Sequence, residues 1–165
     1  GSTINPEIFF LFLLGKGDPA NWEIIEKPAP SSVAKANSGN KNLATSRILS
    51  QTSSSHLRNG SPICLFKSNE FGDFTYSVRV RIDSGAFRQI AGIVFRAKDE
   101  KNFYALLINS IDKKIMLIKV VNGKQVPSWS SLGELNLPKN HWHTLSVVCK
   151  SDRISCYHNG VMINN

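Results

Sequence analysis

Hydrophobic and polar residues alternate without a break from Phe74 to Ile82. The apolar positions are Phe74, Tyr76, Val78, Val80 and Ile82, and the polar positions between them are Thr75, Ser77, Arg79 and Arg81. A period of two residues is typical of a β-strand that buries one face. We therefore expect the apolar set to face the core and Arg79 and Arg81 to face solvent, about 7 Å apart along the strand.

Short apolar runs separated by turn residues continue toward the end of the chain. They cover residues 90–96, 103–108, 115–121, 142–149 and 154–158. In the run 90–96, the residues that would point to either face of a strand are apolar, which predicts a central strand. Asn122-Gly123 predicts a hairpin turn, followed by a loop that holds Pro127 and Trp129, and Asn159-Gly160 predicts another turn. No stretch keeps a helical period, so the pattern predicts an all-β fold, either a two-sheet antiparallel β-sandwich or a barrel.

The first third of the chain has a different character. The apolar run Ile8–Leu14 is much shorter than the ~20 residues of a membrane span and predicts a buried strand. Residues 26–62 are rich in Ser, Asn, Pro and Lys, which predicts loops with short strands near Trp22–Ile25 and Ala44–Leu49. Gly1-Ser2 resembles the remnant of a cleaved tag, and we expect one domain over residues 3–165.

Composition and charge fit an ordinary globular domain with a basic surface. Apolar residues make up 41% and charged residues 19%, and the formal net charge is +8. Such a surface attracts nucleic acid, anionic lipid or acidic polysaccharide. The lysines and arginines are spread along the chain and form no basic stripe interleaved with aromatic residues. We therefore expect no nucleic-acid partner.

The three cysteines, Cys64, Cys149 and Cys156, are an odd number and do not pair completely within one chain. If Ser151-Asp152 is a two-residue turn, Cys156 lies opposite Val147 and diagonal to Cys149. Diagonal positions are ~7–8 Å apart, too far for a relaxed disulfide with a Cα separation of ~5.5–6 Å. The histidines and cysteines lack zinc-ligand spacing, and Asp73, Asp83 and Asp112 form no calcium set, so we expect no metal or cofactor.

Several segments together are similar to a known superfamily. They are Phe71–Phe74, Val78–Gly85, Ala91–Asp99, Asn102–Tyr104, Asn122–Lys124, Trp142–Leu145 and Asp152–Gly160. This order resembles concanavalin A-like lectins and glucanases, and within them laminin-G-like domains and 3-keto-disaccharide hydrolase (family 16 glycoside hydrolase-like) domains. The resemblance implies a jelly-roll sandwich and a secreted or periplasmic location. Trp142 and Tyr157 are interpreted as core aromatics.

The chain departs from the glycosidases of this superfamily at the catalytic strand. Those enzymes carry a Glu-x-Asp-x-x-Glu type cluster, which supplies the acid and the nucleophile, and no such cluster exists here. We therefore expect no catalytic residue and a carbohydrate-binding role, with an acidic glycan as the preferred ligand. The candidate binding residues are Arg79, Arg81, Arg96, Asn102, Tyr104 and Trp129.

Two alternatives remain open. One is a glycoside-processing hydrolase of the 3-keto-disaccharide hydrolase type, with His141, His143, Asp99 and Glu134 as acid–base candidates. The other is a laminin-G-like protein-interaction module. Nothing in the sequence fixes the oligomeric state.

Overall fold

The computed structural model describes residues 2–3, 9–15, 21–28, 45–53, 60–66, 72–85, 89–130 and 135–163. The chain forms two compact units, residues 1–67 and 68–165. A single domain over residues 3–165 stays a prediction. Within the described ranges, no helix has the length and apolarity to cross a membrane.

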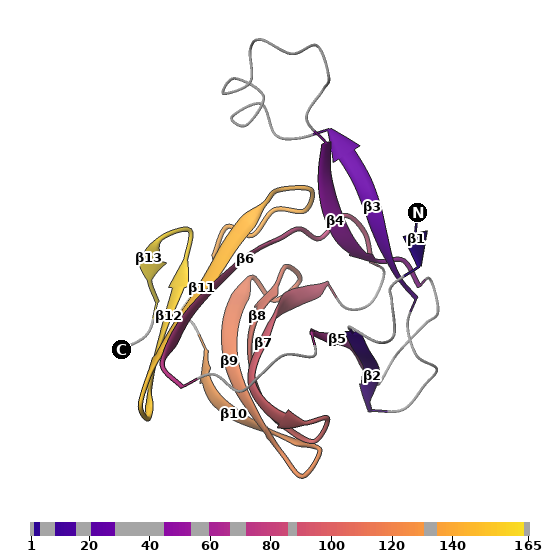
Figure 1. Cartoon of the computed structure of the whole chain (residues 1–165). Helices are drawn as coiled ribbons and strands as arrows, with labels where there is room; N and C mark the ends of the chain where they lie inside the picture. The colour runs from indigo at the N-terminus through magenta and orange to yellow at the C-terminus, as the bar shows by residue number, and fades with distance from the viewer. Residues whose placement is uncertain are drawn as a thin grey trace. The chain divides into compact units, whose positions relative to one another are not determined.

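The first unit consists of two small antiparallel sheets (Figure 1). One joins β1 (Ser2–Thr3), β3 (Trp22–Pro28) and β4 (Thr45–Gln51), and the other pairs β2 (Phe9–Gly15) with β5 (Gly60–Phe66). The strands expected near residues 8–14, 22–25 and 44–49 are confirmed, and β3 and β4 are longer than predicted. The burial of the Ile8–Leu14 side chains and the expected loop over 29–44 lie outside the described residues.

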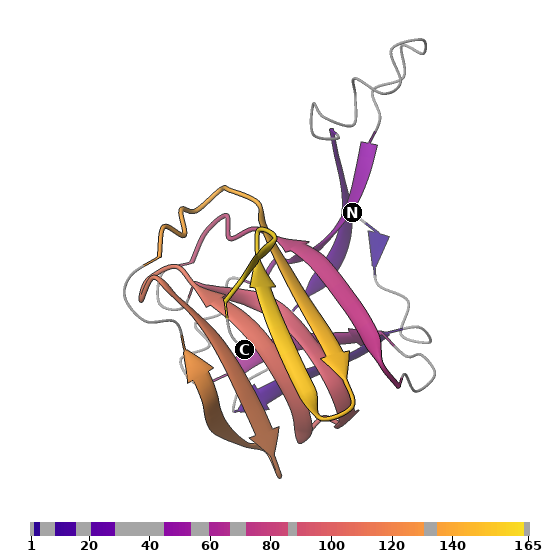
Figure 2. The same ribbon diagram turned by 90° about the vertical axis from the view of Figure 1, so that its left-hand side faces the viewer.

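The second unit is a sandwich of two four-stranded antiparallel sheets. The front sheet has the order β13 (Val161–Met162), β12 (Arg153–His158), β11 (His143–Lys150) and β6 (Phe74–Val80). The back sheet has the order β10 (Lys124–Ser130), β9 (Lys114–Val121), β8 (Asn102–Asn109) and β7 (Ile90–Asp99). Figures 1 and 2 show the sheets face to face. The predicted all-β jelly-roll sandwich is confirmed.

The core lies between these two sheets. Leu106, Ile108 and Ile115 of the back sheet and Leu145 and Val147 of the front sheet are each fully buried in one cluster. Every second residue of β11, from His143 to Cys149, is buried, as the period of two predicts. Both Asn-Gly turns have two successive residues with positive φ, which fits type I′ hairpins.

The predicted register of the 74–82 strand is confirmed, with one exception. Val78 and Val80 pack against the core and Ile82 is buried, whereas Arg79 is exposed. Tyr76 was expected in the core but is 45% exposed. Because β6 is the outermost strand of its sheet, a neighbouring strand covers it on one side only, and the large ring is left partly uncovered.

Two expectations about the back sheet are wrong. The apolar 90–96 segment was expected to be a central strand, but β7 is an edge strand, and the inner strands of this sheet are β8 and β9. The segment with Pro127 and Trp129 is not a loop but strand β10, with an irregularity between these two residues. Proline is compatible with this position because an edge strand does not need every N–H for pairing.

Candidate functional site

The outward face of the front sheet is rich in hydroxyl groups. The register of β6, β11 and β12 places on this face Thr75, Ser77, Arg79, Thr144, Ser146, Val148, Ser155 and Tyr157. The Ser77 and Ser146 hydroxyl oxygens are 2.7 Å apart and hydrogen-bonded across the strands. We call this surface the outer face; it is the side of the front sheet turned toward the viewer in Figure 2.

Trp142 joins two of the predicted site residues at one end of the outer face. The guanidinium carbons of Arg79 and Arg81 lie 5.0 and 4.9 Å from the centre of the Trp142 ring, within cation–π range. Trp142 is half-buried and directly precedes β11, next to the end of β6. These three side chains form what we call the arginine–tryptophan cluster, in which three planar groups meet.

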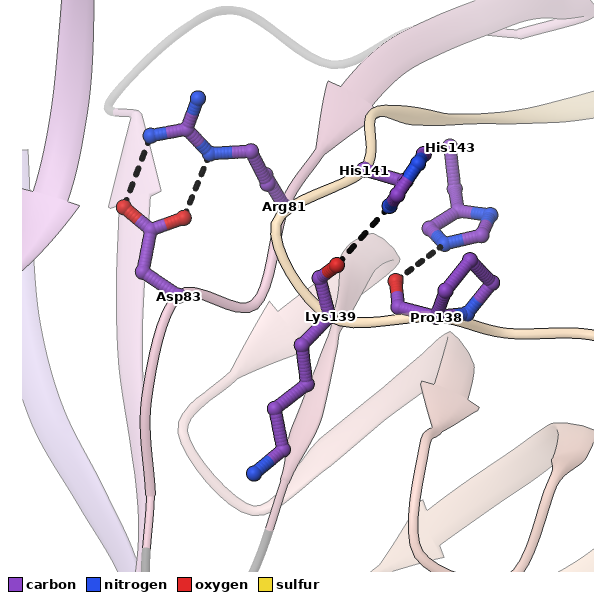
Figure 3. Close-up of polar contacts among 6 residues, drawn as sticks. All are labelled: Arg81, Asp83, Pro138, Lys139, His141 and His143. Atoms are coloured by element: carbon purple, nitrogen blue, oxygen red, sulfur yellow. Dashed lines mark hydrogen bonds and ion pairs between the residues drawn. The ribbon is translucent and has the colours of Figure 1, made fainter.

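The two arginines of the cluster differ in their partners. Arg81 makes a two-pronged ion pair with Asp83, with Nε–Oδ1 and Nη2–Oδ2 distances of 2.5 and 2.8 Å (Figure 3). This hydrogen bond raises the pKa of Arg81 above its ordinary value. Arg79 is exposed, and no ion pair between it and another described residue is found. The guanidinium that is available to an anion is therefore that of Arg79.

Backbone contacts fix the position of Trp142. The Asn159 side chain accepts a hydrogen bond from the Thr144 amide at 2.8 Å, and the Asn159 amide donates to the Thr144 carbonyl at 2.8 Å. The Asn140 amide donates to the Ile82 carbonyl at 2.9 Å. The residues on both sides of Trp142 are thus held to the ends of β6 and β12.

Three histidines lie beside the cluster and have different environments. His143 is 4% exposed, and its Nδ1 lies 3.1 Å from Nε2 of His158. Burial, and then the charge of His143, lower the pKa of His158. His141 is exposed, and its Nδ1 lies 2.9 Å from the Lys139 carbonyl (Figure 3). A carbonyl only accepts hydrogen bonds, so the bond places the His141 proton on Nδ1 and leaves Nε2 as a base.

Arg96 does not join Arg79 and Arg81. It was expected to do so if its strand were the neighbour of β6, but β7 belongs to the back sheet. Arg96 has a φ of 48° at the irregular end of β7 and donates to the Ser151 carbonyl in the β11–β12 turn. That turn is about 23 Å from Thr144 at the rise of a strand, at the opposite end of the sheet.

Asn102 and Tyr104 also lie away from the cluster, on β8. The Asn102 amide group donates to Asp99 at 2.9 Å, and its side-chain oxygen accepts from the Asn122 amide at 3.1 Å. Asn102 thus joins the two turns at the end of the back sheet. Tyr104 stacks on Phe95 with ring centres 5.9 Å apart and packs against the core.

The other residues named from the sequence lie outside the arginine–tryptophan cluster or outside the described residues. Trp129 is on β10, where its Cα partner is Leu117, and not on a loop above the arginines. Asp99 accepts the Lys101 amide at 2.7 Å, and this hydrogen bond lowers its pKa. Glu134 lies outside the described residues. Asp73, Asp83 and Asp112 each accept a separate hydrogen bond, and the described ranges hold no group of three potential metal ligands.

The sequence interpretation missed Trp142, which it placed in the core. The signal was present in the parity of the strand. Leu145, Val147 and Cys149 form the buried set of β11, and Trp142 is out of phase with them, on the side of Thr144. The same alternation that placed Arg79 outward therefore places Trp142 outward as well.

Comparison with a solved structure supports the fold. The carbohydrate-binding module CBM66 from Bacillus subtilis superposes with a TM-score of 0.56 at 24% sequence identity. The match covers 61% of this chain and 62% of that module. No curated protein sequence matches the chain.

The family comparison covers almost the whole chain. Residues 15–165 match the model of the 3-keto-alpha-glucoside-1,2-lyase-like domain. This range includes the complete sandwich and the arginine–tryptophan cluster. The expected resemblance to 3-keto-disaccharide hydrolase domains is thereby confirmed, and the chain belongs to the 3-keto-alpha-glucoside-1,2-lyase-like domain family.

Proposed function

We propose that the protein is a carbohydrate-binding domain whose binding surface is the outer face, centred on the arginine–tryptophan cluster. The observation that carries this proposal is the gathering of Arg79 and Arg81 within 5.0 Å of the Trp142 ring on a hydroxyl-rich sheet face. The fold likeness to a module described as carbohydrate-binding supports it.

The chemistry of the cluster suits a sugar. Planar guanidinium groups donate paired hydrogen bonds to neighbouring hydroxyls, and the Trp142 ring contacts both guanidinium groups of the cluster. Thr144, Ser77 and Ser146 continue the polar surface along the strands beyond the cluster. Their hydroxyls both donate and accept hydrogen bonds, as sugar hydroxyls do.

An acidic glycan is the finer form of the proposal, and it depends on Arg79. Because Asp83 occupies the fork of Arg81, a ligand carboxylate has one uncompensated guanidinium to bind in the cluster. A guanidinium binds a carboxylate through two parallel hydrogen bonds. The net charge of +8 adds a long-range attraction that salt screens.

The test is affinity electrophoresis of the full chain through gels that contain neutral or acidic polysaccharides. Trp142→Ala should weaken retention several-fold, since it removes the cation–π contacts with both arginines, each of about 0.5–1 kcal/mol, and Arg79→Ala should weaken it most on acidic polysaccharides. Lys124→Ala is the charge control, because Lys124 is an exposed cationic residue at the start of β10 in the back sheet, outside the outer face. Equal retention of all three variants would refute the site.

An enzyme is the second candidate, favoured by the family match to a lyase-like domain. In such a 1,2-elimination, a base removes the C2 proton, which the adjacent C3 ketone acidifies; the C1=C2 double bond forms as the C1–O bond breaks, and the leaving oxygen takes up a proton. His141 is the exposed histidine beside the cluster, with Nε2 left as a base. Turnover of a 3-keto-glucoside that His141→Ala abolishes would favour this function over binding alone.

The cellular location and a protein partner are two further points. A glycan ligand fits a secreted or periplasmic protein, and we propose that location. The laminin-G-like alternative would use the same face for a protein partner. Retention on a purified polysaccharide that is free of protein separates the two.

A further inference from the structure

The middle of the outer face carries an aromatic ring that is separate from the arginine–tryptophan cluster. Tyr157 of β12 pairs with Ser146 of β11, and Ser146 pairs with Ser77 of β6, so the three residues form one row across the front sheet. Tyr157 was expected in the core, but its buried neighbour in β12 is Cys156, and successive residues of a strand point to opposite faces. Tyr157 is half-buried, and its partner on β13, Met162, is 47% exposed. An apolar surface thus lies beside the two serines.

Hydroxyl groups around this ring are open to a ligand. Within the described ranges, the hydroxyls of Thr144, Ser155 and Tyr157 have no hydrogen-bond partner, and their oxygens are accessible to solvent. The Ser77 and Ser146 hydroxyls bond to each other, which uses one of their two protons. A hydroxyl both donates and accepts hydrogen bonds, so sugar hydroxyls can replace the water that these groups bind.

The contacts on the outer face are spread over more than one sugar ring. Ser146 follows Trp142 by four residues, or about 14 Å at the rise of a strand. Tyr157 lies two strands away from Arg79, which adds about 10 Å across the sheet. A single pyranose at the cluster therefore does not reach the Tyr157 ring. Sites for single small molecules are concave, whereas an open sheet face suits an extended chain that makes several contacts at once.

The charge and the ring of this face indicate which sugar units it binds. Of the outer-face residues named above, Arg79 alone is charged. No cation–π or ring–ring contact joins Tyr157 to another described residue. The face of a phenol ring is negative, so it disfavours a carboxylate, whereas covering it with the C–H side of an uncharged sugar removes apolar area from water.

We propose, resting on the proposed carbohydrate-binding function, that the outer face binds an internal stretch of a glycan along β11. An acidic unit lies at Arg79, and a neutral unit lies on the Tyr157 ring. The ligand class is therefore a polysaccharide that contains both acidic and neutral units.

The test is isothermal titration calorimetry of the full chain with hyaluronan oligosaccharides, in which glucuronate alternates with neutral N-acetylglucosamine. The hexasaccharide should bind roughly tenfold more tightly than the disaccharide, because it spans both contacts. Tyr157→Ala should lower the affinity for the hexasaccharide about three- to tenfold, since it removes the apolar area under the neutral unit, and should leave the affinity for the disaccharide unchanged. Tyr157→Phe should retain most of the affinity, because it keeps the ring.

Two comparisons test whether the effect is specific to the ring and to a neutral unit. Val126→Ala truncates an exposed apolar side chain on β10 of the back sheet and should leave both affinities unchanged. Hexagalacturonate consists of acidic units only, so Tyr157→Ala should lower its affinity less than that of the hyaluronan hexasaccharide. An equal loss for both hexasaccharides would overturn the placement of a neutral unit on Tyr157.

The remaining outcomes separate this inference from the proposed function. Equal affinities of the parent protein for the disaccharide and the hexasaccharide, or an unchanged hexasaccharide affinity in Tyr157→Ala, would overturn the extended binding mode. A chain that acidic polysaccharides retain but that does not bind the hyaluronan hexasaccharide would overturn the combination of acidic and neutral units. If no polysaccharide retains the chain and neither oligosaccharide binds, the proposed function itself fails.

Discussion

Cys149 and Cys156 lie diagonally across the β11–β12 hairpin, because the Cα partner of Cys156 is Val147 and that of Cys149 is Ile154. This is the register that the Ser151-Asp152 turn predicts; both side chains are fully buried, and neither is in a disulfide. The two side chains face the core and do not form a bridge.

The first prediction concerns thiol chemistry. Burial, and then the charge of Cys149, raise the pKa of Cys156 to about 12, and burial raises that of Cys149. Because the thiolate is the reactive form, neither should react with Ellman's reagent in the native protein at mildly alkaline pH. After denaturation without reductant, all three cysteines should react. A count of one would mean that a disulfide is present.

The second prediction concerns Gly92, where β7 and β8 approach closely. A Cβ at this position would lie 2.1 Å from the backbone oxygen of Leu106. Gly92→Ala should therefore force the strands apart and reduce the free energy of unfolding by about 1–3 kcal/mol. Gly72→Ala is the control, because no atom lies within 4 Å of its added Cβ. Urea denaturation with equal midpoints for both variants would contradict the close approach of the two strands at Gly92.

The third prediction is a loss of stability in mild acid. The pKa of folded His158 is lowered from 6.5, so the unfolded chain binds more protons at pH values between the two. The contribution of uncharged His158 to the free energy of unfolding is therefore complete above about pH 6.5 and is lost as the pH falls through the lowered pKa of the folded state. The urea midpoint should drop between about pH 7.5 and pH 5, and less so in His158→Gln. A parallel pH dependence in both proteins would assign the effect to other groups.

The fourth prediction uses the Arg81–Asp83 pair. Asp83→Ala removes a negative charge and frees the fork of Arg81, so retention on an acidic polysaccharide should increase, most strongly at low salt. The melting temperature should change little, because exposed ion pairs contribute little stability. Weaker retention would show instead that Asp83 holds Arg81 in its binding geometry.

The fifth prediction separates a structural residue from a binding residue. Asn102 joins Asp99 to the amide of Asn122, so Asn102→Ala should reduce the free energy of unfolding by about 1 kcal/mol. Its polysaccharide retention should equal that of the parent protein. Reduced retention with unchanged stability would return Asn102 to the binding site.

The local sequence pattern was sufficient to predict those features that depend only on which face of a strand a residue occupies or on the residues of a turn. The alternation from Phe74 to Ile82, the two Asn-Gly turns and the diagonal cysteines follow from a period of two and from turn chemistry. The sheet to which a strand belongs is set by pairing between distant segments. The sequence therefore did not show that β6 pairs with β11 and β7 with β8. For this reason Arg96, on β7, was predicted to lie beside Arg79 and Arg81, on the other sheet.

In the candidate site, too, residues of one strand could be predicted, and a residue brought in from a distant segment could not. Arg79 and Arg81 could be predicted because neighbouring residues of one strand share a face. Trp142 belongs to the same cluster through a contact that spans about sixty residues of chain. Its size suggested a core residue, and only its phase relative to Leu145 indicated the opposite.

The edges of the sandwich bear on how the protein behaves at high concentration. A regular exposed edge is a template on which another chain adds a strand. On β10 the ladder is irregular between Pro127 and Trp129, and proline has no N–H to donate. On the front sheet, β13 is only two residues long. These two of the four sheet edges are therefore poor templates for the addition of a strand from another copy of the chain.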